Sequence, residues 1–255
     1  MTGRPPTLLI VAHGSRDARH AATVTALAAR VRTLAPGVSV AHGFLDFAAP
    51  RVETVLAGLH ASSRREVVAL PLLLNRAFHA TTDIPAVLAG EQARLPGLSV
   101  RQAAVLGPDP LLTRALERRL AEADSAALAR RSDTGVVLAS AGTSDPAARA
   151  ALERVAAGWR ASAGWGAVVS AYASASAPDP AQAVRALRSA GLGRVVVAPY
   201  VIAPGRLPDR IAAGAREAGA DVLAPVLGAA PELAELLVRR YAAARRERRT
   251  AALVG

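Results

Sequence analysis

The 255-residue chain contains no cysteine and no lysine, and only 3% of its residues are aromatic. The absence of cysteine excludes structural disulfides, thiolate metal sites, cysteine-ligated iron–sulfur clusters and cysteine nucleophiles. No run approaches the roughly 18 consecutive apolar residues of a membrane span, and residues 1–6 lack the apolar core of a signal peptide. We therefore expect a cytoplasmic protein that has no membrane partner.

Charge is strongly one-sided, because the formal net charge is +11 and all of the positive side chains besides histidine are arginines. These arginines are spread along helical segments, and no basic run alternates with aromatic residues as in many nucleic-acid-binding proteins. The pattern favours solvated helix faces and predicts no nucleic-acid partner. A second interpretation, the attraction of a polyanionic small molecule, stays open.

Apolar runs and helical patterns alternate along the whole chain. Strands are predicted at residues 7–13, 39–46, 67–74 and 98–106, and again at 135–141, 167–175, 194–203 and 221–227. Helices follow most of them, and Asp-Pro pairs such as Asp145-Pro146 supply an N-cap and a first helical turn. The helix that begins after Asp109 is expected to reach about Ser132. This alternation predicts an α/β fold with parallel sheets covered by helices.

The two halves of the chain resemble each other. Residues 11–17 match residues 139–145, and residues 70–74 match residues 198–202, with the same offset of 128 positions. A shared offset indicates a tandem duplication. We expect an N-terminal domain at 1–125 and a degenerate repeat domain at 133–255, each with a parallel sheet of about four strands. We expect the two domains to face each other across a cleft, and the N-terminal domain to carry a metal site, for the reasons given in the next paragraph. Since the duplication can close this cleft without a dimer, we also expect a monomer.

All five histidines lie in the first half. His13 ends the first predicted strand, Asp46 ends the second, and His79 follows the third. Parallel sheets bind ligands at the carboxyl ends of their strands, and two imidazoles with a carboxylate can bind a first-row divalent metal. The second half has Ala141 and Leu207 at the positions that match His13 and His79. We therefore expect metal to bind only to the first half, with His20 and His60 at the surface and His42 in the interior.

Two other site types fit the sequence poorly. Gly14-Ser15 follows a strand, but no glycine-rich phosphate-binding motif and no lysine accompany it. A serine hydrolase is disfavoured because no G-x-S-x-G motif is present. Ser15 is thus predicted to be a helix N-cap or a substrate contact.

Three segments, residues 12–17, 44–50 and 71–85, resemble the sirohydrochlorin chelatases, the class II tetrapyrrole chelatases, in their long two-domain form. The resemblance implies an enzyme that inserts Fe²⁺, Co²⁺ or Ni²⁺ into sirohydrochlorin in siroheme or cobalamin biosynthesis. It implies neither an organic cofactor nor ATP. A non-catalytic metal or tetrapyrrole carrier on the same fold is the alternative.

The resemblance also assigns roles to residues. His13 would be metal ligand and proton acceptor, His79 would be the second ligand, and Asp46 stands where the family usually has glutamate. The residues implied to line the macrocycle are Leu74, Asn75, Arg76, Ala77 and Phe78. Because the substrate carries several carboxylates, we add Ser15 and Arg16 as substrate contacts, and Arg76 and Arg206 as further carboxylate partners.

Overall fold

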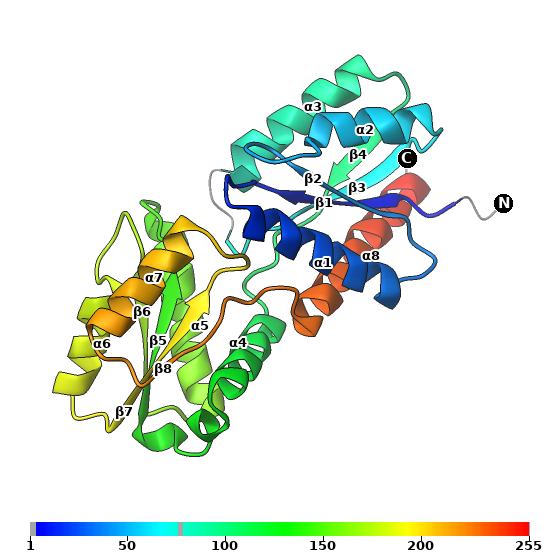
Figure 1. Cartoon of the computed structure of the whole chain (residues 1–255). Helices are drawn as coiled ribbons and strands as arrows, with labels where there is room; N and C mark the ends of the chain where they lie inside the picture. The colour runs from blue at the N-terminus through cyan, green and yellow to red at the C-terminus, as the bar shows by residue number, and fades with distance from the viewer. Residues whose placement is uncertain (1–3, 76–78, 255) are drawn as a thin grey trace. The chain divides into compact units, whose positions relative to one another are not determined.

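The computed structural model describes residues 4–75 and 79–254. The chain divides into two compact units, one made of residues 1–107 with 229–255 and the other of residues 108–228 (Figure 1). Each unit is an α/β layered structure around one parallel sheet. The predicted fold class of parallel four-stranded sheets flanked by helices is confirmed.

The first unit contains four parallel strands in the order β2-β1-β3-β4. Their bounds are β1 Thr7–Ala12, β2 Val40–Phe44, β3 Glu66–Pro71 and β4 Ser99–Gln102. The helices are α1 Ala18–Leu34, α2 Val52–Ala61, α3 Ile84–Arg94 and α8 Pro231–Val254, and a π-helical turn spans His79–Asp83. Helices α2 and α3 cover one face of the sheet and α1 and α8 cover the other (Figure 1).

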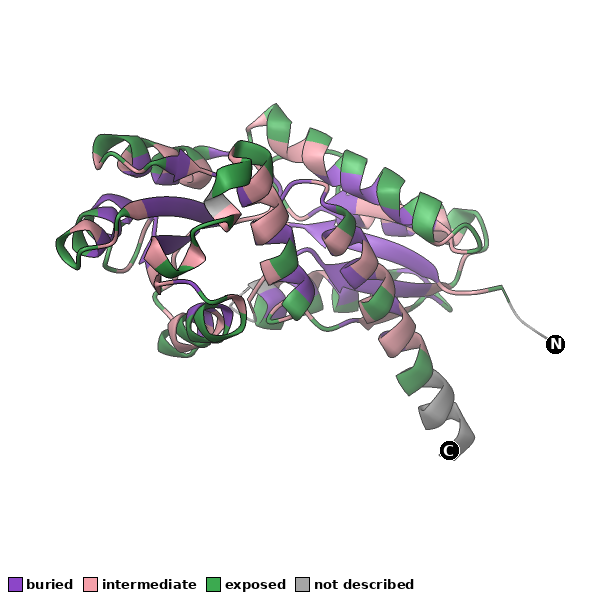
Figure 2. Cartoon of the chain, turned by 90° about the horizontal axis from the view of Figure 1, so that it is seen from below, coloured by how far each residue is buried: buried purple, intermediate pink, exposed green. Residues whose placement is uncertain are grey.

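The core of this unit follows from the sequence pattern of its central strands. All six residues of β1 are buried, as a strand covered on both faces requires. Leu9 and Val11 pack with Leu56 of α2 and Leu88 of α3 in one apolar cluster. Figure 2 shows the buried residues concentrated on the strands and on the inner faces of the helices.

The second unit repeats this plan, with four parallel strands in the order β6-β5-β7-β8. The strands are β5 Thr134–Ser140, β6 Ala167–Tyr172, β7 Arg194–Tyr200 and β8 Val222–Leu223. The helices are α4 Pro110–Ala123, α5 Pro146–Ala163, α6 Pro180–Ser189 and α7 Arg206–Glu217, and two short 3₁₀ turns span Ser125–Leu128 and Arg131–Asp133. Val137, Val184, Val197 and Ile211 belong to its apolar cluster, which joins the sheet to α6 and α7.

The compact units differ from the predicted domains at 1–125 and 133–255. The chain leaves the first unit after Gly107 and returns to it at Ala229, so α4 belongs to the second unit and α8 to the first. Arg119 of α4 donates hydrogen bonds to the carbonyl of Leu227, and Arg240 of α8 donates to the carbonyls of Val105 and Leu106. The prediction assumed that each repeat keeps its own helix, whereas the two repeats exchange their last helices.

Several helix termini confirm the local predictions and others correct them. Asp109, Asp145 and Asp179 cap their helices with proline in the first turn. The helix expected to reach Ser132 ends at Ala123, because the extended backbone of Asp124 stops it and caps a 3₁₀ turn. Asp83 makes no capping hydrogen bond, since the π-helical turn runs directly into α3. In the described part of the chain, no helix is long and apolar enough to cross a membrane.

Candidate functional site

The loops that follow β1, β2 and β3 lie at one edge of the first sheet. In the order β2-β1-β3-β4, connections from β1 and from β3 lead to opposite sides, so the strand order reverses between these two neighbours. Open α/β sheets bind their ligands at such a reversal, outside the carboxyl ends of the strands. The topology therefore places the loop of His13 and the loop of His79 on either side of the expected binding position.

His13 is half-buried and directly follows β1. Its carbonyl accepts a hydrogen bond of 2.8 Å from the Asp46 amide, which joins the first loop to the second. Gly14 makes this close approach possible, because a Cβ at this position would lie 1.7 Å from the carbonyl oxygen of Asp46. Gly14 also has a φ of 99°, which favours glycine. The loop thus needs glycine beside the candidate ligand.

Phe47 lies against His13 in the loop after β2. The two ring centroids are 6.0 Å apart and the ring planes are inclined by 71°. The guanidinium carbon of Arg16 lies 5.3 Å from the centroid of the same phenyl ring, within cation–π range. Phe47 lies in segment 44–50, which resembles the chelatase family, but no role was predicted for this residue. The sequence signal that could have pointed to Phe47 is the rarity of phenylalanine, since the chain has only three.

Asp46 is exposed, and its carboxylate is engaged within its own loop. Oδ1 accepts hydrogen bonds of 2.8 Å from the Phe47 amide and 2.9 Å from the Arg51 guanidinium. The pKa of Asp46 is lowered mainly by the Phe47 hydrogen bond; burial acts in the opposite direction, and Arg51 and the charge of His13 add to the lowering. The carboxylate therefore stays ionised and orders the loop. Its predicted role as a metal ligand stays a prediction.

Ser15 and Arg16 occupy the turn between β1 and α1. The Ser15 hydroxyl accepts a hydrogen bond of 3.1 Å from the Asp17 amide, whereas Asp17 itself caps α1. Ser15 is therefore not the helix N-cap, and its role as a substrate contact stays a prediction. Arg16 is exposed beside Phe47, a position from which its guanidinium can reach a carboxylate.

The loop after β3 holds the other predicted ligand. Leu74 and Asn75 are half-buried, and His79 begins the π-helical turn. Arg76, Ala77 and Phe78 lie outside the described residues, so their predicted contacts stay predictions. Gln102 at the end of β4 donates from its side-chain nitrogen to the Ala80 carbonyl at 2.8 Å, fixing the backbone next to His79. Single π-helical turns that are continuous with α-helices are frequent at functional sites.

The remaining histidines have other environments. His20 was predicted at the surface but is half-buried on α1, where burial and the charge of His13 lower its pKa. His42 is half-buried on β2 and lies 3.4 Å from the Thr25 hydroxyl, and burial lowers its pKa too. His60 contacts the Pro96 carbonyl at 2.9 Å near the end of α2. Among the described residues, no three histidine, aspartate or glutamate side chains form a group suited to a metal.

In the second unit, the loops after β5 and β6 share backbone features with the loops after β1 and β2, but their side chains differ. Gly142 has a φ of 101°, and a Cβ there would lie 1.9 Å from the Ser174 carbonyl oxygen, as for Gly14 and Asp46. Ala141 replaces His13, and Ala175 replaces Phe47. These pairs all keep the predicted offset of 128 positions.

The third loop is shorter in the second unit. Fourteen positions separate Pro71 from Pro85, whereas nine separate Pro199 from Pro208 at the matching strand and helix. Leu207 therefore matches Ile84 rather than His79, and the His79 segment has no counterpart. The asymmetry predicted from the histidines thus extends to the backbone.

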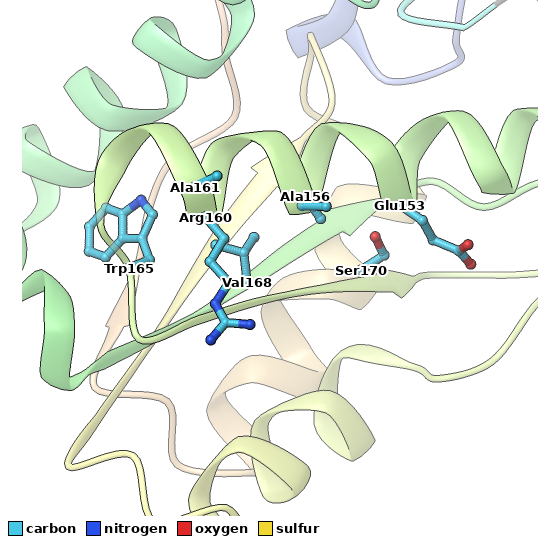
Figure 3. A pocket seen from close by; sticks show the side chains of 8 residues that line it. Glu153, Ala156, Arg160, Ala161, Trp165, Val168 and Ser170 are labelled. Atoms are coloured by element: carbon cyan, nitrogen blue, oxygen red, sulfur yellow. The ribbon is translucent and has the colours of Figure 1, made fainter.

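A cavity of about 550 Å³ lies elsewhere in the second unit, between α5 and β6. Figure 3 shows Trp165 and Arg160 near one end of it and Glu153 near the other, with Ala156 and Ser170 between them. No histidine lines it, and it borders none of the three loops described above.

Comparison with known proteins decides the family. A sequence model of the CbiX family matches residues 7–123 and 135–244, which is most of both repeats. The chain belongs to the CbiX family. The two matched segments follow the predicted repeats in the sequence, even though the folded units exchange their last helices.

Two sirohydrochlorin chelatases match most of the chain. The sirohydrochlorin ferrochelatase of Priestia megaterium is 26% identical over 234 residues, covering 90% of this chain and 87% of the relative. The sirohydrochlorin cobaltochelatase of the same organism is 24% identical over 205 residues, covering 80% and 67%. The predicted family resemblance is confirmed.

Solved structures share the fold. SirB from Bacillus subtilis with Fe³⁺ superposes with a TM-score of 0.81 at 21% identity, covering 94% of this chain and 95% of that one. The structure of CbiX described as the terminal enzyme for biosynthesis of siroheme in denitrifying bacteria has a TM-score of 0.68 at 24% identity, covering 93% and 98%. The two-repeat architecture is therefore the architecture of these proteins.

Proposed function

We propose that this protein is a sirohydrochlorin chelatase that inserts Fe²⁺ or Co²⁺ into sirohydrochlorin, in siroheme or cobalamin biosynthesis. The observation that carries this proposal is the position of His13 at the strand-order reversal of the first sheet, in a loop fixed by Gly14. Membership of the CbiX family supports it, as do the ferrochelatase and cobaltochelatase activities named for the two relatives.

The reaction requires a ligand that is also a base. A divalent metal replaces two pyrrole N–H protons of the macrocycle, so two protons leave for each metal inserted. A neutral imidazole can hold the metal through its nitrogen lone pair and accept a proton once the metal has moved to the ring nitrogens. We assign these two roles to His13 and the role of second ligand to His79. The other proton passes to solvent.

Asp46 supports His13 through the loop in this proposal. Its carboxylate is held by the Phe47 amide and Arg51, and its amide is bonded to the His13 carbonyl. A fixed negative charge near His13 favours a bound cation and an imidazolium, whether or not Asp46 itself ligates the metal.

Arginines supply the contacts to substrate carboxylates. Arg16 is exposed next to Phe47. We propose Arg16 and Arg76 as carboxylate partners, while Ser15, Leu74, Asn75, Ala77 and Phe78 complete the proposed substrate contacts. The role of Arg206 stays a prediction. Guanidinium groups suit this task because they bind carboxylates in a bidentate manner.

The test is metallation of sirohydrochlorin by the purified protein, followed by absorbance with Fe²⁺, Co²⁺ and Ni²⁺ in turn. His13→Ala should lower turnover by about 10²–10⁴-fold, the range for loss of a well-placed base, and His79→Ala should also lower turnover because a metal ligand is lost. His60→Ala is the matched control, because this imidazole contacts Pro96 at the far end of α2 and should leave turnover unchanged.

Thermal unfolding of each variant shows whether the fold is retained. Variants that bind tetrapyrrole and metallate at the parent rate would refute the assignment of His13 and His79. A parent protein that binds sirohydrochlorin and metal but accelerates no insertion would replace the enzyme by a carrier. We further propose that the protein acts as a cytoplasmic monomer without nucleic acid, ATP or an organic cofactor, which sedimentation of the active protein and assays without added nucleotide would test.

A further inference from the structure

Phe47 is an unusually exposed aromatic side chain. Its exposed fraction is 49%, and among the described residues only Leu34, at 51%, is another large apolar side chain exposed to this degree. The two remaining phenylalanines are Phe44, which is fully buried, and Phe78, which lies outside the described part of the chain. An apolar ring left in water loses the free energy that burial would give. Packing in the core therefore does not explain why a phenylalanine stands at this position.

The fold does not require an aromatic residue at this position. Phe47 has a φ of 59°, in the left-handed region that residues other than glycine seldom occupy. Ala175 has the same conformation in the second unit, with a φ of 61°. The loops are also bonded alike, since the amide of Phe44 donates to Pro50 and the amide of Tyr172 donates to Pro178 at the same length of 2.9 Å. Alanine is thus sufficient for this loop, and the phenyl ring serves another purpose.

The ring belongs to a set of side chains that only the first unit has. Phe47 contacts His13 and Arg16, and all three project from the loops after β1 and β2. The matching residues of the second unit are Ala141, Ser144 and Ala175. One repeat thus combines an imidazole, a cation and an exposed aromatic ring, whereas the other has none of them on the same backbone.

We propose that Phe47 is a substrate-binding residue on which one face of the tetrapyrrole stacks. This inference rests on the proposed function and adds the surface that recognises the macrocycle. A flat, apolar ring system with carboxylates at its rim matches an exposed phenyl ring with a guanidinium 5.3 Å from its centroid. The matching surface of Ala175 offers neither group.

The inclination of His13 suits the same arrangement. A metal binds to an imidazole nitrogen in the plane of the imidazole ring. With 71° between the two ring planes, a macrocycle that lies parallel to Phe47 would be met at a steep angle by an edge of the imidazole, which includes the ring nitrogens, and not by its face. Phe47 thus both binds the macrocycle and sets the angle between the macrocycle and the proton acceptor His13.

The experiment measures sirohydrochlorin binding to the full-length protein by absorbance titration without metal. Phe47→Ala, which installs the residue of the second repeat, should weaken binding by about tenfold, the scale of a stacking contact on an aromatic side chain. Phe47→Tyr should restore binding to within about twofold, because the ring is retained. Leu34→Ala is the matched control, since it removes an equally exposed apolar side chain at the end of α1, outside the three loops.

Two further measurements separate stacking from damage to the site. Co²⁺ binding without tetrapyrrole should be unchanged in Phe47→Ala, because a phenyl ring donates no ligand atom, and thermal unfolding should be unchanged because alanine occupies this conformation in Ala175. The inference is overturned if Phe47→Ala binds sirohydrochlorin as tightly as the parent, or if Leu34→Ala loses as much affinity. Because the readout is binding, a parent that binds tetrapyrrole without metallating it refutes the enzyme proposal while the effect of Phe47→Ala still decides this one. A parent that binds no sirohydrochlorin overturns both.

Discussion

Replacing Gly14 by alanine tests how closely the first two loops must approach. The added Cβ would lie 1.7 Å from the Asp46 carbonyl oxygen, whereas Cβ atoms essentially never come within 3.0 Å of such an atom. The loops of His13 and Asp46 must therefore separate by more than about 1 Å, a displacement that can lower the rate of a positioned reaction by about 10²-fold. We expect a loss of turnover of this size in Gly14→Ala.

The same substitution also lowers the free energy of unfolding. A φ of 99° costs a residue with a Cβ about 1–2 kcal/mol, and loss of the hydrogen bond between the Asp46 amide and the His13 carbonyl costs about 1 kcal/mol more. The total is about 2–3 kcal/mol, which denaturant titration can measure. Turnover should be assayed at a temperature at which the variant is fully folded.

The second repeat provides the control. Gly142→Ala places a Cβ 1.9 Å from the Ser174 carbonyl oxygen at a φ of 101°, so its cost in stability should be similar. Because no imidazole follows β5, turnover of the folded Gly142→Ala protein should stay near the parent value. Equal losses of turnover in both variants, or parent turnover in Gly14→Ala, would refute the idea that the glycine fixes the position of His13.

Three other predictions concern the His79 loop, the half-buried histidines and the arginines. Gln102→Leu introduces the residue found at the same register of the second sheet, Leu223, and removes the hydrogen bond to the Ala80 carbonyl next to His79. It should lower turnover by about fivefold without changing sirohydrochlorin affinity. Unchanged turnover would show that this hydrogen bond does not position His79. Burial lowers the pKa of His20 and His42 below 6.5, so the unfolded chain binds protons more readily, and thermal stability should decrease as the pH falls below that value. His42→Gln should reduce this decrease between pH 7 and 5, and a slope identical to that of the parent would contradict the assignment. If arginines bind the substrate carboxylates, the KM for sirohydrochlorin should rise with ionic strength, and a constant KM would leave the net charge of +11 without a role in binding.

Local chemistry made much of the fold predictable. Asp-Pro pairs cap helices wherever they occur at the predicted starts, because the carboxylate binds free amides and proline suits the first turn. Buried parallel strands such as β1 are recognisable as short apolar runs, since both of their faces are covered. Repetition at a constant offset and the histidines of the first half then identified the duplication and its asymmetry.

Part of the candidate site was also predictable from strand ends. His13 lies at the carboxyl end of β1, and His79 begins the turn that precedes α3, because the period of the pattern changes there from strand to helix. Asp46 follows β2 as expected. Its hydrogen bonds to the Phe47 amide and Arg51, however, depend on how the loop folds back and leave no signal in residue spacing.

The sequence by itself determined the α/β class, the two repeats and the half that carries the imidazoles, because these depend on local propensity and on residue identity. Only the tertiary structure decided which repeat each terminal helix packs on, since this depends on contacts between residues far apart in the sequence, such as Arg240 with Val105 and Arg119 with Leu227. It also decided that Gly14 touches the Asp46 carbonyl, that Gln102 holds Ala80 and that Phe47 stays exposed in contact with His13 and Arg16. These contacts join residues that are distant in sequence, and their energies depend on distances of a few ångströms that only the folded chain sets.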